Sequence, residues 1–385
     1  MAHALIIGGG IAGAAVAAHL ARAGREVVLI ERKAAAHDKV CGEFISGEAR
    51  LYLRQLDIEP QALGAVSISA VNLYAGHTVV TADLPFPALS VSRRLLDEAI
   101  LTTASAHGAE LRRGRAVQSL RPLGGGWVAE LDDGSRISAT DVFLATGKHD
   151  LRGWKRPAGQ QNDLIAFKLH WRVTAGQIAA LESCVELFLF PGGYAGLSLI
   201  ESGVANLCLV VRRHHFAKLN NRWDLLLSSL RAAFLPLHQT LADAEACSER
   251  PLAIASIPYG FVQRRSDGPW RLGDQAAVIP SFSGDGISIA LHSARLASEY
   301  YLTGKTNCEF QSTLARDIAA QVRTATLLSR MLVHAKGQTI AMVVARSAPT
   351  LVGNIANRTR IPSRRLITTK QEGKAHTNMH RALTA

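Results

Sequence analysis

Three glycines near the start of the chain have the spacing of a phosphate-binding turn. A short apolar run, residues 4–7, ends in Gly8-x-Gly10-x-x-Gly13, and an Ala-rich segment of helical composition follows over residues 14–22. In a dinucleotide-binding unit the first glycine makes a tight turn, the second lets the backbone approach a pyrophosphate, and the third lets helix and strand pack closely. The helix N-terminus then offers free N–H groups and a partial positive charge to the phosphates.

An acidic residue stands where the ribose of such a nucleotide needs one. Glu31 ends a second apolar run, residues 26–30, about 20 residues beyond the glycines, and a carboxylate there can accept hydrogen bonds from ribose hydroxyls. The glycine pattern alone is weak, because Ala- and Gly-rich helices produce it by chance. Since strand, glycines, helix and acidic residue are all in register, the sequence predicts a nucleotide site, with a chance glycine turn as the alternative.

A second glycine-bearing stretch lies far along the chain. A predicted strand ends in Gly273-Asp274, a loop passes through Pro280, and Gly284-x-Gly286 opens a predicted helix that lasts to about residue 302. Glycines at a helix start let a ligand come close to the free N–H groups there. Asp274 either positions a ligand at the strand end or caps a turn.

The segments between these stretches alternate between strand and helix patterns. Residues 66–81 predict two strands joined near residue 75, and the apolar alternation slips by one step after Ala70, which indicates a β-bulge. Further strands are predicted at 110–120, 127–131, 136–138, 141–147, 167–173, 185–190, 197–200 and 204–211, and helices at 48–56, 93–106 and 223–234. The four strands from 167 to 211 read as an antiparallel sheet.

Three separated stretches resemble the FAD-dependent oxidoreductases that share the para-hydroxybenzoate hydroxylase fold. That group includes aromatic monooxygenases, flavin-dependent halogenases and geranylgeranyl reductases. The stretches are Gly8 to Gly13 with Glu31, then Ala145-Thr146-Gly147, then Gly273-Asp274 with Pro280 and Gly284-x-Gly286. The resemblance covers about residues 1–305.

Val40-Cys41-Gly42-Glu43 looks most like the geranylgeranyl-reductase branch of this group, where a Cys-Gly element lies beside the flavin ring. Two departures limit the analogy. Gly196-Leu197-Ser198 replace the Trp and Phe-Pro of the reductases, and Gly147-Lys148-His149-Asp150 stand where the hydroxylases carry the Asp-Gly motif that assists NAD(P)H. The halogenase Trp-x-Trp-x-Ile-Pro element is absent from the sequence, which argues against halogenation.

The resemblance implies FAD as the cofactor. The first glycines would cradle the pyrophosphate, Glu31 would bond the adenosine ribose, and Asp274 would position the ribityl region. The amides of residues 284–287 would face the flavin oxygen where negative charge gathers on reduction. Arg93 matches an FAD-contacting arginine, or else is a surface residue. The expected FAD contacts are Gly8, Gly10, Ile11, Ala12, Gly13, Glu31, Arg32, Arg93, Ala145, Thr146, Gly147, Gly273, Asp274, Pro280, Gly284, Gly286 and Ile287.

Four residues are candidates for catalysis: Cys41, Glu43, His170 and Tyr194. By the resemblance, Cys41 and Glu43 sit where a loop meets the flavin ring. Cys41 is either a redox partner or a small packing residue, and Glu43 is either a proton donor or a carboxylate that flanks a helix. His170 and Tyr194 lie on the expected substrate sheet, where His170 is an acid–base candidate or a structural histidine. No metal site is predicted.

We therefore predict an α/β protein: a Rossmann-like FAD-binding domain with an inserted antiparallel-sheet substrate domain and a helical C-terminal region. The FAD domain would comprise residues 1–165 and 250–305, with strands near 66–90 joining the substrate sheet. The substrate domain would span 166–249, and 306–385 would form the helical region with a flexible basic tail, polar and small from about Thr368.

Charge and cysteine content narrow the classes of partner and compartment. Of the net charge of +12, residues 305–385 carry +10, from 13 Lys and Arg against 3 Asp and Glu, so the basicity belongs to the tail. No DNA- or RNA-binding motif accompanies it, and we expect no nucleic-acid partner. The tail is a candidate for peripheral membrane contact or is simply a solvated face. The following cysteines are scattered, odd in number and without CxxC spacing, which favours reduced thiols in a cytoplasmic protein: Cys41, Cys184, Cys208, Cys247 and Cys308.

The leading functional prediction is a monooxygenase that oxidises a hydrophobic, aromatic or polyketide-like metabolite of secondary metabolism with reduced flavin and O2. The first alternative is a reductase like the geranylgeranyl reductases, which would deliver hydride to a C=C bond of an isoprenoid or other lipid. The second is a flavin-binding module without turnover. NAD(P)H is the expected electron donor, and a carrier protein or a separate reductase is a candidate partner.

Overall fold

The first apolar run lies at the centre of a mixed sheet. The computed structural model describes residues 2–266 and 268–367. Strand β1 (Ala2–Ile7) pairs in parallel with β2 (Val27–Glu31) on one side and β9 (Arg136–Leu144) on the other. The sheet order is β6-β2-β1-β9-β8-β7, with β16 beside β9. The remaining bounds are β6 Glu110–Arg113, β7 Val117–Leu123, β8 Gly126–Leu131 and β16 Trp270–Arg271.

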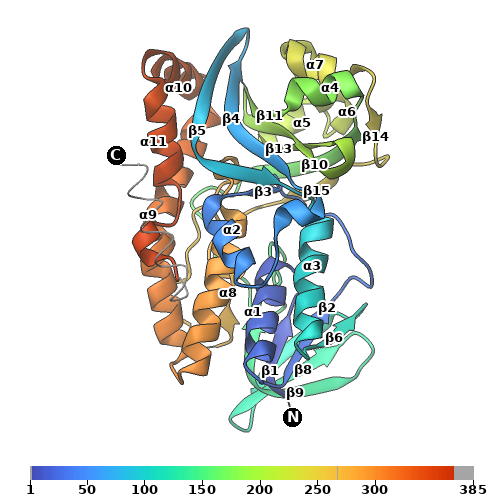
Figure 1. Ribbon diagram of the computed structural model, residues 1–385, viewed down its shortest axis with the longest axis vertical. Coiled ribbons are helices and arrows are strands. Elements are labelled where there is room, and N and C mark those ends of the chain that lie inside the picture. The colour runs from blue at the N-terminus through green and yellow to red at the C-terminus, as the bar shows by residue number, and fades with distance from the viewer. Residues whose placement is uncertain (1, 267, 368–385) are drawn as a thin grey trace.

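Three helices pack on one face of this first sheet (Figure 1). They are α1 (Ile11–Arg22), α3 (Arg93–Ala106) and α8 (Gly286–Leu302), and α1 lies against both others. Helix α1 is built almost entirely of Ala, Val, Leu and Ile, and its small buried side chains let the neighbouring helices approach it closely. Together with α2 (Gly47–Arg54) these helices enclose the largest apolar core of the described residues.

A second sheet lies above the first in Figure 1, in the order β14-β10-β13-β12-β11-β4-β5-β3, with β15 beside β10. Its strands β10 to β13 are antiparallel, whereas β11 and β4 pair in parallel. The bounds are β3 Phe44–Ile45, β4 Val66–Ala75, β5 Thr78–Ser90, β10 Leu164–Arg172, β11 Ser183–Phe190, β12 Gly193–Ile200, β13 Val204–Arg212, β14 Glu245–Ala246 and β15 Leu252–Ala255.

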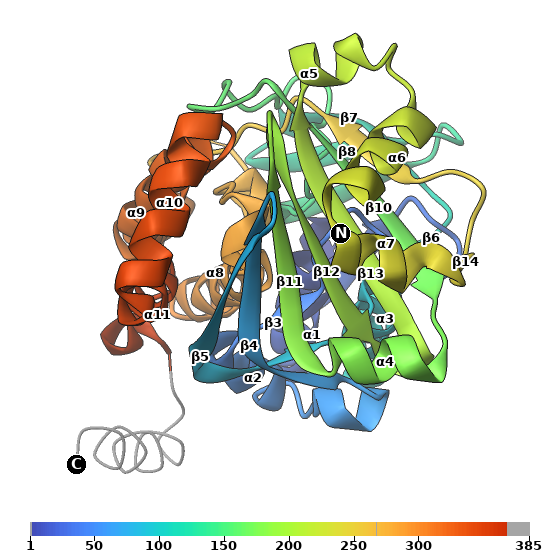
Figure 2. The same cartoon turned by 90° about the horizontal axis from the view of Figure 1, so that it is seen from above.

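The two faces of the second sheet have different neighbours (Figure 2). Helices α4 (Ala175–Leu181), α5 (Arg213–Lys218), α6 (Trp223–Ala233) and α7 (Leu235–Ala242) cover one face and share an apolar core with it. The other face meets the first sheet's loops and the C-terminal helices α9 (Asn307–Leu332), α10 (Ala335–Ser347) and α11 (Pro349–Arg358). On β10, Phe167, Leu169 and Trp171 point to the helix-covered core, so Lys168 and His170 point the opposite way.

The structure confirms the expected β-bulge but not one of the expected strands. A register shift between Ile68 and Ala70 of β4 confirms the bulge. The single strand expected over residues 110–120 is wrong, because β6 and β7 occupy opposite edges of the first sheet and residues 114–116 cross between them. The predicted tail from Thr368 lies outside the described residues.

Among the described residues, no single helix has both the length and the apolar character needed to cross a bilayer. One bent helix pair, Ala335–Ser347 with Thr350–Arg365, passes the same test by length and composition alone.

Candidate functional site

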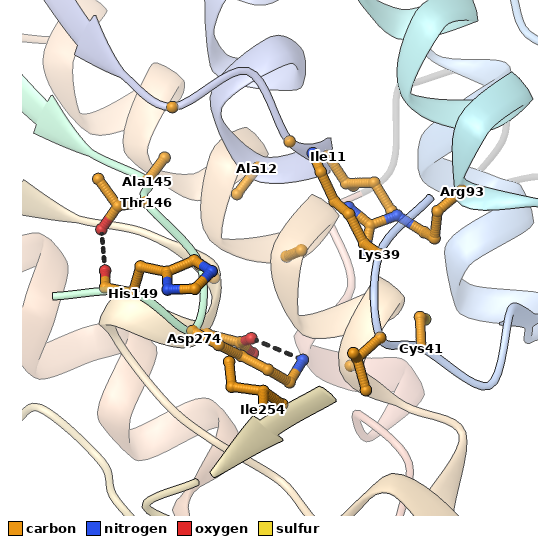
Figure 3. Close-up of a pocket in the computed structure, with 18 of the residues that line it drawn as sticks. Ile11, Ala12, Lys39, Cys41, Arg93, Ala145, Thr146, His149, Ile254 and Asp274 are labelled. Carbon is orange, nitrogen blue, oxygen red and sulfur yellow. Dashed lines mark hydrogen bonds and ion pairs between the residues drawn. The ribbon is translucent and has the colours of Figure 1, made fainter. Parts of the chain in front are cut away.

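A cavity of about 520 Å³ lies where the loops of the first sheet face the second sheet. Its walls come from the turn between β1 and α1, the loop 37–43, the start of α3, residues 145–151, strands β10, β13 and β15, and residues 272–290. Figure 3 shows Lys39, Arg93 and Cys41 on one side and Thr146, His149 and Asp274 on the other. Segments more than 200 residues apart in the sequence therefore meet at one site.

The three N-terminal glycines form a backbone cradle at this cavity. Gly8 has a φ of +106°, and a Cβ there would lie 2.5 Å from the carbonyl oxygen of Ala145. A Cβ on Gly13 would lie only 1.8 Å from the carbonyl oxygen of Gly8, so the turn and helix can pack this closely only with glycine. Gly10, by contrast, faces the cavity, and no side chain caps the α1 N-terminus that follows it. The free amides of that helix are available to an anion.

Glu31 is fixed by backbone amides at the carboxyl end of β2. Its Oε2 accepts from the amide of Gly9 at 2.7 Å and its Oε1 accepts from the amide of Lys33 at 2.9 Å. The side chain is buried yet lines the cavity. Each carboxylate oxygen keeps a further lone pair, so Glu31 can still accept from a ribose hydroxyl.

Two cations share one carboxylate beside Gly10. Asp97 accepts from Arg93 Nε at 2.7 Å and from Lys39 Nζ at 2.7 Å, and both cations line the cavity. Burial raises the pKa of Asp97, but Arg93 and Lys39 outweigh it and hold this pKa below its ordinary value. The cluster therefore carries a net positive charge next to the open glycine, as a bound pyrophosphate requires. Lys39 and Asp97 were not predicted from the sequence.

Asp274 lies across the cavity and is also paired. Its carboxylate accepts from Lys148 Nζ at 3.1 Å (Figure 3). Its carbonyl accepts from Arg156 at 2.6 Å. Burial raises the pKa of Asp274, but Lys148 and Arg156 hold it below its ordinary value, so the group is a carboxylate. Arg156 also bonds Asp150 at 2.7 Å, which ties residues 148–150 to the strand end.

The N-terminus of α8 opens on the same cavity. Gly284 has a φ of +67°, and a Cβ there would lie 2.7 Å from the ring of Phe44. Gly284, Gly286 and Ile287 line the cavity, and no side chain caps the helix. Two uncapped helix N-termini thus converge on one space, each able to stabilise negative charge.

Asp285, immediately before α8, makes a buried ion pair that the sequence did not indicate. Its Oδ1 lies 3.2 Å from Arg360 of the C-terminal segment, and its Oδ2 accepts from Gln321 at 2.8 Å. The guanidinium also lies over the rings of Phe86, at 4.4 Å, and Phe44, at 5.3 Å. The C-terminal segment is therefore attached directly to the helix start that faces the cavity.

Burial raises the pKa of Asp285 to about 7 despite Arg360. A folded-state pKa above the ordinary value near 3.8 means that the folded protein holds a proton that the unfolded chain has released. The stability from this residue is fully present at low pH and falls as pH rises from about 4 to about 7. We expect Asp285→Asn to remove that part of the pH dependence of Tm. Equal slopes for variant and wild type over this range would contradict the assignment.

Glu43 is the centre of a buried charged group, here called the Glu43 cluster: Glu43, Lys168 and His170. Its carboxylate, fully buried, accepts from Lys168 Nζ at 2.5 Å and lies 2.9 Å from His170 Nε2. Burial raises the pKa of Glu43, but His170 and Lys168 outweigh it and hold it below its ordinary value. The backbone amide of Arg93 also donates to Glu43 at 2.8 Å, so the same carboxylate flanks the start of α3.

Asp38 and Cys41 lie at the edge of the Glu43 cluster. Asp38 Oδ1 is 3.9 Å from His170 Nδ1 and has no hydrogen-bond partner among the described residues. The sulfur of Cys41 accepts from the amide of Glu43 at 3.3 Å. Ligand atoms of Asp38, Glu43 and His170 lie within 4.8 Å of one another, as in a metal site, but the Lys168 ammonium already supplies a cation there.

The cavity wall on the second-sheet side is mainly apolar. It is formed by Ala166 of β10, Cys208 of β13, Ile254 of β15 and the nearby residues Ile257, Tyr259 and Val278. Ala166, Ile257, Tyr259 and Val278 belong to one buried apolar cluster, so this wall suits a hydrophobic ligand.

The cavity lining can be compared with the predicted site residues. The predicted residues that line it are Gly8, Gly10, Ile11, Ala12, Glu31, Arg32, Cys41, Glu43, Arg93, Ala145, Thr146, Gly147, Gly273, Asp274, Pro280, Gly284, Gly286 and Ile287. Gly13 packs behind the turn. His170 does not line the cavity but lies beside two residues that do, with its Nε2 2.9 Å from Glu43 and its Nδ1 3.9 Å from Asp38. The Tyr194 hydroxyl lies behind the wall, 3.3 Å from the wall residue Ser281.

Lys168 was missed because a lone lysine within an apolar strand carries no local signal. Lys148, Arg156 and Arg360 were missed for the same reason, since each acquires its role from a partner far away in sequence. Their only signal is burial, and burial needs the fold.

The residues present fit FAD. The open Gly10, the uncapped α1 and the Arg93–Lys39 pair would hold the pyrophosphate, Glu31 the ribose, and Asp274 the ribityl chain. The uncapped α8 would lie at the pole of the flavin ring that becomes negative on reduction. With FAD bound in this way, Glu43 and the apolar wall would lie at the remaining side of the cavity.

Comparisons with known proteins agree with this fit. Residues 3–76 match the FAD dependent oxidoreductase family. A menaquinone reductase of Mycolicibacterium smegmatis is 26% identical over 79% of this chain and 77% of that protein. A digeranylgeranylglycerophospholipid reductase 2 of Methanopyrus kandleri is 27% identical over 77% of this chain and 75% of that protein.

Solved structures share the fold at low sequence identity. The flavin-dependent brominase Bmp2 superimposes with a TM-score of 0.75 and 16% identity over 100% of both chains. The halogenase PltM superimposes with a TM-score of 0.74 and 18% identity, covering 86% of this chain and 76% of that one. At these identities the likeness concerns the fold alone.

Proposed function

We propose that this chain, an FAD-dependent oxidoreductase with the para-hydroxybenzoate hydroxylase fold, reduces a carbon–carbon double bond of an isoprenoid or other lipid-like substrate. The observation that carries the proposal is the Glu43 cluster, a buried acid–base group at the cavity beside an apolar wall. Both relatives described above align with more than three quarters of the chain and are reductases by name, which supports the same choice.

Reduction of a C=C bond adds a hydride to one carbon and a proton to the other. Bound FAD in its reduced form supplies the hydride. The apolar wall orients the substrate and keeps water away from it. The protein must then provide a proton at the second carbon, and Glu43 is the acid–base group that lines the cavity there.

The proton would move through the Glu43 cluster. Since Lys168 and His170 keep Glu43 ionised at rest, we assign the stored proton to the imidazole of His170, whose Nε2 faces the Glu43 carboxylate. It passes from His170 Nε2 to Glu43, 2.9 Å away, and from Glu43 to the substrate carbon. Glu43 returns to a carboxylate, and His170 recovers a proton by way of Asp38, whose side chain is partly exposed.

The test is the mass of the product. Purified enzyme with FAD and NADPH is incubated without oxygen with a menaquinone or with digeranylgeranylglycerophospholipid. From either substrate class we expect a product that has gained two hydrogens and no oxygen and that keeps both hydrogens after any quinol is re-oxidised in air, because reduction of a quinone ring alone would also add two hydrogens. A product that gains oxygen when air is admitted, with none formed without it, would overturn the reductase assignment.

A monooxygenase is the second candidate. The apolar, buried wall supports it, because oxygen transfer from a reduced flavin also needs a site that excludes water. Its substrate would be an aromatic or polyketide-like metabolite. Product formation that depends strictly on O2 would favour the monooxygenase over the reductase. A bound flavin that no electron donor reduces, with or without ligand, would favour the third alternative, a flavin-binding module without turnover.

We propose NAD(P)H as the electron donor and the cytoplasm as the location. A separate reductase or a carrier protein is the candidate partner. In place of an Asp-Gly element, residues 147–150 are tied to Asp274 through Lys148 and Arg156. Anaerobic titration with NADH, NADPH and a reductase separates these donors.

A further inference from the structure

The C-terminal helices carry an exposed apolar stripe. Leu327 of α9 is 57% exposed, Ile340 and Val343 of α10 are 57% and 58% exposed, Val344 is 37% exposed, and Leu351 of α11 is 43% exposed. On α10, Ile340, Val343 and Val344 follow at helical spacing and share one side of the helix. We call these five side chains the C-terminal apolar surface.

The opposite side of α10 is firmly attached to the second sheet. The side chain of Gln338 donates to the carbonyls of Phe190 and Leu332, each at 2.7 Å. Met342 and Ala345 are buried in the same apolar cluster as the cavity residues Tyr259 and Val278. The exposed stripe is therefore held in a fixed orientation and is backed by the cluster that contributes to the cavity wall.

The segment that carries the stripe has charges of one sign only. The sequence has no Asp or Glu from residue 318 to residue 371. Exposed Lys and Arg flank the apolar residues at Arg323, Arg330, Lys336, Arg346, Arg358 and Arg364. Figure 2 shows α9, α10 and α11 together along one edge of the molecule, away from α4 to α7.

We propose that the C-terminal apolar surface binds the face of an anionic lipid bilayer. Apolar side chains flanked along the chain by cations are the pattern of a helix lying in the membrane interface, where Lys and Arg are attracted to anionic lipid headgroups. The bent pair α10–α11 is also the one segment of the described chain with membrane-like length and composition. The proposed function supplies the reason, since a lipid-like substrate is dissolved in the bilayer.

Vesicle flotation of the full chain loaded with FAD tests this directly. The probes are vesicles of phosphatidylcholine alone and of phosphatidylcholine with phosphatidylglycerol. We expect the protein to float with the anionic vesicles and to be released by salt. The pair Arg330→Glu with Lys336→Glu, and the pair Ile340→Ser with Val343→Ser, should each weaken binding more than about tenfold. The matched control Leu123→Ser, at a 55% exposed leucine of β7, should bind normally.

The outcomes separate this proposal from the reductase assignment. The membrane proposal is overturned if the protein does not float, or if all variants float equally. It is also overturned if light scattering shows a dimer that the Ile340→Ser and Val343→Ser pair converts to a monomer, because the surface would then join two copies of the chain. Flotation does not require turnover. Binding to vesicles without any reductase activity would therefore support the membrane-binding surface and contradict only the proposed reductase function. Detergent-dispersed substrate should be reduced equally well by wild type and by the surface variants.

Discussion

Glu43→Gln should lower the rate of substrate reduction by about 10²–10⁴-fold, the usual contribution of a positioned general acid, while FAD remains bound. Glutamine keeps the shape of the side chain, and its amide oxygen can still accept from Lys168 and from the Arg93 amide, but its –NH2 group cannot accept the proton of His170 or pass it to the substrate. Turnover at saturating substrate and the FAD content of the purified variant measure the two effects separately.

The variant also leaves the Lys168 ammonium without its counterion, at a side chain only 1% exposed. Breaking a buried pair on one side costs about 3–5 kcal/mol of stability. A double variant, Glu43→Gln with Lys168→Met, removes both charges and should recover much of that loss in Tm. If Glu43 serves only as the partner of Lys168, the double variant regains turnover as well as stability. Recovery of stability without recovery of turnover is the result that we expect.

Gly10→Val should give a folded protein without bound FAD. In the structure, the neighbours of a Cβ at Gly10 are the ends of Lys39 and Arg93, at 3.4 and 3.5 Å, so the branched side chain fits once these flexible groups move aside. It then occupies the space that a pyrophosphate needs beside the α1 N-terminus. The variant should be colourless, with a far-ultraviolet circular dichroism spectrum like that of wild type.

Gly176→Val is the matched control for Gly10→Val. Gly176 lies in α4, on the far side of the second sheet, and a Cβ there meets nothing within 4 Å. This control should remain yellow and fully loaded. A Gly10→Val protein that retains FAD would contradict the assignment of the glycine cradle.

The sequence predicted the parts of the site that depend on local backbone geometry. Gly8, Gly13 and Gly284 could be recognised because a turn or a close helix crossing excludes a side chain there, and such a restriction leaves its mark in a few adjacent residues. The same holds for the bulge in β4, which shifts the apolar alternation by one position. In each case the cause and the pattern lie in the same segment.

The charged partners could not be predicted in this way. Lys168 meets Glu43 from 125 positions away, and Arg360 meets Asp285 from 75 positions away. Their pairing depends on which strand lies beside which loop, and the local sequence is the same whether a lysine in an apolar strand points to solvent or to a buried carboxylate. Tyr194 shows the converse, since it lies on the expected sheet but behind Ser281.

Anaerobic reoxidation of the bound flavin is the most direct test of the proposed chemistry. The holoenzyme is reduced without oxygen, excess donor is removed, and the isoprenoid substrate is added while the visible absorption of the flavin is followed. A C=C reductase predicts that the oxidised flavin band returns in proportion to the substrate added. Flavin that stays reduced with every such substrate until oxygen enters, and then yields an oxygenated product, would contradict the account.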